Sequence, residues 1–268
     1  HEEALYAAVF VKLMDLPPFC NARNIGPEVE LAIKNITARL QQADLTINFQ
    51  PSSFFATKNT STVYQQMYER GSKATDGSGK LILSGGSNGM NPVGERDKAD
   101  TRITFRQGVG TGSTSGIGRF MQTGGVNQLS DGNYEVANKH FNPRTRQNFA
   151  ALNWRRSERG GAPTYGESHF ILDASLKPGA IYYIGDTFNA RQSAESRATF
   201  GTIFSLILWA DPEVVEALIR ACYYKIEDKA YRKLIAGGDS KMLLEAHLFN
   251  PITFRGSVKE MVVARADC

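Results

Sequence analysis

The residues best suited to chemistry lie in the segment 243–249, which reads Leu-Leu-Glu-Ala-His-Leu-Phe. Alternation along a β-strand puts three aliphatic side chains on one face and places Glu245 and His247 together on the other. A carboxylate and an imidazole between apolar neighbours are typical of an apolar cleft wall that carries one acid. An amphipathic edge strand whose Glu245 and His247 face water explains the spacing equally well. The pattern leaves both interpretations open.

A second set of candidates belongs to hydrolase chemistry. Residues 85–89 read Gly-Gly-Ser-Asn-Gly, which is a G-x-S-x-G pattern behind a predicted strand. Ser87, Asp186 and His247 follow in the order of nucleophile, acid and base found in α/β-hydrolases. Pro92 stands where such a nucleophile must be followed by a helix, and this favours a plain glycine loop. A serine hydrolase therefore remains an alternative function.

Other cofactor motifs are missing from the sequence. Residues 108–112 are glycine-rich but lack the Lys-Ser/Thr ending of a phosphate-binding loop. No H-E-x-x-H motif and no second histidine near His247 offers a metal site. The three cysteines lie far apart in the sequence, so no disulfide framework is expected. We expect no metal.

The composition narrows the possible partners. The chain has 268 residues, of which 41% are hydrophobic and 22% charged, as in ordinary globular proteins. A net charge of +4 is too small to indicate a nucleic-acid partner. The longest strongly apolar stretch, 202–210, has about half of the roughly 20 residues that a bilayer span needs. We expect neither nucleic acid nor membrane as a partner.

The elements that must position the candidates are helical first and then rich in β-structure. Residues 1–44 read as two helices, the second amphipathic with Pro27 near its start. Residues 189–237 read as helical again, and a turn at 177–179 predicts that the strands on either side of it pair as a hairpin. Strands are predicted over residues 45–51, 80–83, 102–105, 149–154, 167–176, 180–188, 242–249 and 258–264.

Strands and helices do not alternate regularly, and this indicates an α+β protein. We expect one domain over residues 1–268, with N-terminal helices and a mixed or antiparallel β core over 45–268. The helical segment 189–237 would be an insertion before the last strands.

Several segments of the β-rich part resemble one bacterial family. They are FAALNW from Phe149, APTYGESHFIL from Ala162, GDTF from Gly185, LLEAHLFNPI from Leu243 and VKEMVV from Val258. The segments LTINFQP and YQQMYERG precede them in the family's order. The chain is thus similar to a family catalogued as a domain of unknown function, whose members include secreted effector enzymes resembling ADP-ribosyltransferases. One of those effectors modifies a threonine of ubiquitin.

The resemblance implies a mono-ADP-ribosyltransferase with an ADP-ribosyltransferase-like β core. Such an enzyme uses NAD as a substrate, transfers ADP-ribose to a side chain of a host protein and releases nicotinamide. A threonine of ubiquitin is one candidate acceptor. The resemblance also implies secretion by a bacterium into the host-cell cytoplasm. A protein-binding module without catalysis is a further alternative.

The same resemblance suggests roles for individual residues. Glu245 would hold a ribose hydroxyl and stabilise positive charge on the ribose. Asn153 would orient the ribose. The family's early strand ends with an arginine, whereas residues 50–53 read Gln-Pro-Ser-Ser here. Arg70 and Arg106 are therefore the candidates for holding the pyrophosphate.

The remaining candidates are weaker. Ser87, Asn88 and Tyr165 would contact nicotinamide or the acceptor, and His247 would line the NAD site beside Glu245. Glu167 is the rival acid, and its alternative is a surface carboxylate in a turn. Because Glu245-Ala246-His247 carries a single acid, the resemblance implies an acceptor other than arginine.

Overall fold

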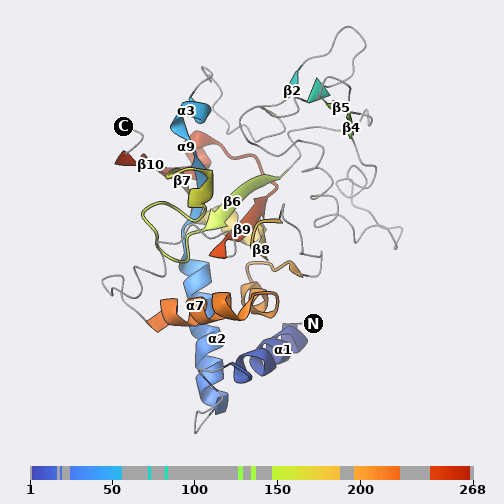
Figure 1. Cartoon of the computed structure of the whole chain (residues 1–268), viewed down its shortest axis with the longest axis vertical. Coiled ribbons are helices and arrows are strands. Elements are labelled where there is room, and N and C mark those ends of the chain that lie inside the picture. Colours follow the sequence, from blue (N-terminus) through green and yellow to red (C-terminus); the bar gives the residue numbers. More distant parts are fainter. Residues whose placement is uncertain are drawn as a thin grey trace.

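A computed structural model of the chain describes residues 2–16, 19, 25–55, 147–187, 196–223 and 242–265 (Figure 1). It also describes the backbone of four short strands between residues 72 and 136. The arrangement is α+β, with the helices of the N-terminal part followed by an antiparallel sheet, as the sequence predicts.

The two predicted N-terminal helices are present as α1 (Glu2–Met14) and α2 (Ile25–Gln42). Helix α2 begins two residues before Pro27, which stands in its first turn. Its apolar face is buried, and it consists of Val29, Ala32, Ile33, Ile36 and Leu40. The helical periodicity of the sequence therefore marks the side of α2 that packs on the core.

Six strands form the central sheet in the order β10-β7-β1-β6-β9-β8, and each neighbouring pair is antiparallel. The strands are β1 (Leu45–Phe49), β6 (Asn148–Leu152), β7 (Ser168–Leu172), β8 (Ile181–Ile184), β9 (Leu244–Leu248) and β10 (Val258–Val262). Short helical turns accompany them: α3 (Pro51–Phe54), η4 (Pro163–Tyr165), η5 (Ala174–Gly179) and α9 (Phe254–Ser257). The predicted last two strands are confirmed as β9 and β10.

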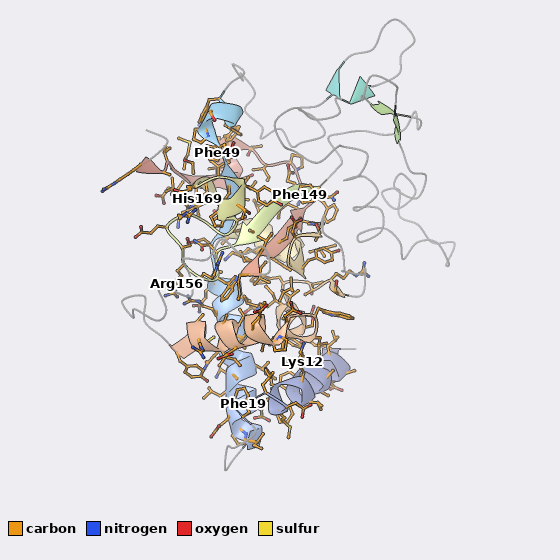
Figure 2. The ribbon with its side chains drawn as sticks, viewed as in Figure 1. Lys12, Phe19, Phe49, Phe149, Arg156 and His169 are labelled. Carbon is orange, nitrogen blue, oxygen red and sulfur yellow. The ribbon has the colours of Figure 1, made fainter. Side chains whose placement is uncertain are left out.

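The two faces of this sheet differ in character. One face carries residues such as Leu45, Leu152 and Leu244, which belong to one hydrophobic cluster with α1, α2 and α7 (Pro212–Tyr223). Figure 1 shows these helices grouped below the sheet in that view. The other face, here called the polar face, carries the row Thr46, Ala151, Glu245 and Tyr183, which the strand register aligns. Figure 2 shows Phe149 and His169 at the sheet and Lys12 and Phe19 in the helical part.

The predicted hairpin around residues 177–179 is wrong. Strand β7 pairs with β1 and β10, whereas β8 pairs with β9 and is the last strand on that side of the described sheet. Residues 174–179 form η5, whose first turn is capped by the Asp173 carboxylate accepting from the N–H of Ser175 at 2.9 Å. Because this helical turn carries the chain past three intervening strands, β7 and β8 cannot form a tight hairpin.

Every strand of the central sheet ends before its predicted limit. Strand β6 ends at Leu152, and the residues that follow it turn away from the sheet. Of the predicted helical segment 189–237, the structure describes residues 196–223. There, the helices are η8 (Ile203–Leu208) and α7, whereas Ala198 makes an isolated bridge to Tyr182. Residues 203–207 of the apolar stretch 202–210 are buried in η8, whereas Trp209 is 46% exposed.

A smaller sheet with the order β2-β3-β5-β4 is described by its backbone alone. Its strands are β2 (Ser72–Lys73), β3 (Ile82–Leu83), β4 (Val126–Gln128) and β5 (Tyr134–Val136). Strand β3 lies within the predicted strand 80–83. The predicted strand 102–105 lies outside the described residues.

Candidate functional site

Glu245 and His247 lie on the polar face of β9 and are both buried. The side chain of Glu245 is 6% exposed and that of His247 is 0% exposed. Strand β9 lies between β6 and β8, and all five of its residues are buried. The interpretation of 243–249 as a wet edge strand is therefore wrong.

Three contacts from two residues hold the Glu245 carboxylate. The N–H of Thr187 donates to Oε2 at 2.8 Å, and the Thr187 hydroxyl donates to Oε1 at 2.8 Å. The Nε2 atom of His247 lies 3.0 Å from the same Oε1. Hydrogen bonds to an ionised acceptor are stronger than those between neutral groups. The carboxylate is thus fixed in one orientation.

The position of one proton follows from these contacts. An ionised carboxylate only accepts hydrogen bonds, so its contact with His247 requires a proton on Nε2. The Thr187 hydroxyl lies 3.2 Å from the same Nε2 and closes a triangle of three side chains. His247 therefore donates to Glu245 through Nε2. Because this nitrogen carries the proton, it cannot act as the base that takes a proton from a nucleophile.

The local sequence explains how Thr187 reaches Glu245. Gly185 follows β8 with φ at 77°, a left-handed conformation that glycine adopts without strain. Its N–H donates to the carbonyl of Leu243 at 2.7 Å, and it forms a bridge to Leu244. This turn holds the chain against β9, so that Thr187 is placed against the Glu245 carboxylate.

Aromatic rings from the two strands beside β9 flank His247. The ring of Phe149 on β6 lies 5.1 Å from the His247 ring in an edge-to-face arrangement. The ring of Tyr183 on β8 lies 4.9 Å away and is tilted by 48°. Phe149 is only half-buried. The polar face therefore carries one oriented acid and, beside its histidine partner, a partly accessible aromatic ring.

Of the other predicted site residues, Asn153 holds a turn together. Its Nδ2 donates to the carbonyl of Ser157 at 2.8 Å, and its Oδ1 accepts from the N–H of the same residue at 2.8 Å. The alternation that placed Asn153 on a strand does not apply, because β6 ends at Leu152. Both ends of its amide serve the backbone.

Tyr165 and Glu167 lie at the surface near the start of β7. Tyr165 is 51% exposed, and its hydroxyl donates to the carboxylate of Asp186 at 2.8 Å. Glu167 forms an ion pair with Arg159 at 2.6 Å, and both side chains are more than 40% exposed. Glu167 thus matches the alternative of a surface carboxylate in a turn.

Four predicted residues lie outside the described residues: Arg70, Ser87, Asn88 and Arg106. The hydrolase alternative therefore lacks a described nucleophile. Its other two members are described, and the carboxylate bonded to the imidazole of His247 is Glu245.

Gln147 is a further candidate that the sequence did not single out. It directly precedes β6 and is 0% exposed, and within the described part of the chain neither its Nε2 nor its Oε1 has a hydrogen-bond partner. Leaving a buried polar group unpaired costs about 1–3 kcal/mol. A glutamine beside a predicted strand gives no sign of this in the sequence, because the lack of a partner is a property of the folded structure.

The described part of the chain holds neither a metal cluster nor a membrane-spanning helix. There, no cluster of three or more His, Cys, Asp or Glu side chains is arranged to hold a metal ion. In the same residues, no helix combines the length and the apolar character needed to cross a membrane.

The chain as a whole was also compared with known proteins. It matches no protein-family model and no curated protein.

Proposed function

We propose that the protein is a mono-ADP-ribosyltransferase that uses NAD and modifies a side chain of a host protein. The observation that carries the proposal is the buried Glu245 carboxylate, which Thr187 and His247 hold in one orientation on a central strand. The family resemblance described above supplies the reaction class, and a threonine of ubiquitin is the candidate acceptor.

The reaction requires little from the protein beyond a fixed negative charge. The bond between the ribose carbon and the nicotinamide nitrogen breaks, and nicotinamide leaves with the electron pair. The acceptor oxygen forms the new bond to that carbon, and its proton passes to solvent. A preorganised carboxylate stabilises the positive charge that develops on the ribose in the transition state.

Two features of the site support this assignment. The Glu245 carboxylate lies beside His247, which the half-buried ring of Phe149 flanks, in a region of low exposure where charge interactions are strong. The hydroxyl and N–H of Thr187 leave Glu245 no freedom to turn away from a ligand. The role of Arg70 and Arg106 as candidates for holding the pyrophosphate stays a prediction. Secretion into a host cell is part of the same proposal.

Substitution of Glu245 by glutamine tests the proposal. The amide introduced by Glu245→Gln can accept from the Thr187 N–H with its oxygen and donate to the Thr187 hydroxyl with its nitrogen. His247 can take the tautomer with its proton on Nδ1 and accept from the same nitrogen, so the fold is expected to persist. Loss of the charge is expected to lower transfer by at least about 100-fold. The measurement is transfer of label from NAD to ubiquitin and to a eukaryotic lysate.

The matched control is Glu167→Gln, which removes the exposed rival acid. This variant should transfer label at the wild-type rate, and circular dichroism should show that both variants are folded. Wild-type rates for Glu245→Gln would exclude a catalytic role for Glu245. Turnover of NAD without a labelled protein would instead identify a glycohydrolase.

A further inference from the structure

The side-chain amide of Gln147 is a feature of the polar face that the proposed function has not yet used. Gln147 is fully buried, and its donor and its acceptor both lack a partner among the described residues. Buried side-chain amides in folded proteins are almost always hydrogen-bonded. A ligand that displaces the side chains covering this amide can supply the missing partner.

The strand register places this amide beside the candidate site. Phe149 is paired with His247, and Gln147 lies two residues before Phe149, so both side chains belong to the same face of the sheet. Diagonal neighbours on one face of an antiparallel pair are close enough for long side chains to meet. Gln147 is thus the diagonal neighbour of His247, and it lies beyond Phe149 on the side away from Glu245, which is paired with Ala151.

The chemistry of the unpaired group defines what can satisfy it. A primary amide offers N–H donors and a carbonyl acceptor in one plane. A second primary amide completes both in a pair of antiparallel hydrogen bonds, whereas a carboxylate offers no donor and a ketone lacks the N–H. The neighbouring aromatic ring suits a flat, apolar ligand body. The preferred ligand is therefore an aromatic carboxamide.

We propose that Gln147 is the specificity-determining residue that recognises the carboxamide of the nicotinamide ring. This inference rests on the proposed function, since NAD supplies that ring. The carbonyl oxygen of Gln147 accepts from the carboxamide nitrogen, and its Nε2 donates to the carboxamide oxygen. Gln147 then positions the leaving group, while Glu245 acts on the ribose.

The test compares ligands that differ only at the carboxamide. Binding of NAD, of nicotinic acid adenine dinucleotide and of 3-acetylpyridine adenine dinucleotide is measured by titration calorimetry on wild-type protein and on Gln147→Leu. Wild-type protein should prefer NAD by about tenfold to a hundredfold, the effect of one or two lost hydrogen bonds. In Gln147→Leu this preference should fall to within about threefold.

A second measurement separates recognition from a structural role. Leucine needs no hydrogen-bond partner, so Gln147→Leu without ligand should unfold at a Tm no lower than that of the wild type. The matched control is Asn148→Ala. Asn148 is also buried, and its oxygen also lacks a partner in the described part of the chain, but it lies on the opposite face of β6. This variant should keep the preference for NAD.

The outcomes distinguish this inference from the proposed function. If wild-type protein binds NAD and Gln147→Leu discriminates among the three ligands as well as the wild type does, the role of Gln147 is overturned and the proposed function stands. The role of Gln147 is also overturned, and the proposed function also stands, if Asn148→Ala loses the preference for NAD to the same extent as Gln147→Leu. If wild-type protein binds none of the three, the proposed function fails first and this inference fails with it.

Discussion

Thr187 gives Glu245 two hydrogen-bond donors, one for each carboxylate oxygen, and so sets the orientation of the acid. The backbone N–H would remain in any variant except proline, but the hydroxyl also touches Nε2 of His247. The side chain of Thr187 therefore links the acid to the imidazole, and the three groups form one buried unit.

Substituting Thr187 by valine tests that link, because the shape is kept and the hydroxyl is lost. Glu245 Oε1 then loses one of its donors in a buried environment, and unfolding by urea should show a loss of about 1–3 kcal/mol. Thr187→Ser keeps the hydroxyl and should lose less. Equal stabilities of the two variants would show that the hydroxyl contributes nothing.

At the scale of residues, the sequence predicts which side chains share one face of a strand. It does not predict which side chains of different segments touch each other. The spacing of Glu245 and His247 placed them on a common face, and the structure confirms this. Thr187 escaped notice because its contact depends on the turn at Gly185, and the unpaired state of Gln147 depends on everything around it. Burial likewise excludes the wet edge strand, and spacing alone does not determine burial.

At the scale of the elements, the connection between β6 and β7 lies across β1 and is held by single residues. Thr46 accepts from the N–H of Gly161 at 2.9 Å, and Asn48 donates to the carbonyls of Arg159 and Gly166 at 2.7 and 2.8 Å. Gly166 has φ at 134°. The side chains of Thr46 and Asn48 thus hydrogen-bond to backbone groups of the irregular segment 159–166, which has no strand partner for them.

Gly166→Ala should damage this connection. A Cβ atom at position 166 would lie 2.1 Å from the carbonyl oxygen of Phe49, and the backbone conformation disfavours any side chain. We expect a loss of at least about 3 kcal/mol in the free energy of unfolding. The control is Gly201→Ala, because no described atom lies within 4 Å of the added Cβ there. It should change stability by less than about 0.5 kcal/mol. A similar result for both variants would contradict the geometry of the β1 contact.

Periodicity located most of the described elements, and their pairing was harder to predict. The apolar stripe of α2 follows from local burial, which a sequence displays. The strands β1 and β9 were located by the alternation of residue types, although nearly all of their residues are buried. Strand β8 pairs with β9 because η5 leads the chain past the three strands that lie between β7 and β8. The residues of a short turn do not reveal which strand the chain will pair with next. A tight turn and a capped helical turn share the same residues, and the capping contact of Asp173 selects the second.

At the scale of the whole molecule, one hydrophobic cluster joins α1, α2, η8 and α7 to the face of the six-stranded sheet opposite the polar face. Charged groups are partly buried at its margins. Lys12 on α1 donates to the carbonyls of Leu208 and Ala210 at 3.0 and 2.8 Å, and burial lowers its pKa. Lys177 donates to the carbonyl of Gln41 at 2.9 Å, and burial lowers its pKa as well. These contacts tie helices to the core through backbone carbonyls.

The stability of the whole molecule should depend on pH through His169 on β7. Burial lowers the pKa of His169 below its ordinary value near 6.5, and the carbonyl of Glu167 and the charges of Glu260 and Asp44 oppose the shift only in part. Above that value both the folded and the unfolded states hold the ring neutral. As the pH falls below it, the unfolded chain takes up a proton first, and the folded state loses stability.

The loss through this one group is at most about 1.4 kcal/mol for each pH unit. It ends once the pH lies below the lowered pKa of the folded state, where both states are protonated. Wild-type protein should therefore lose more free energy of unfolding between about pH 7.5 and pH 5.5 than His169→Gln, which has no group at this position that titrates there. Urea unfolding at both pH values measures the difference between the two proteins, and contributions from other groups cancel. Equal losses would show that His169 takes up its proton as readily in the folded state as in the unfolded chain.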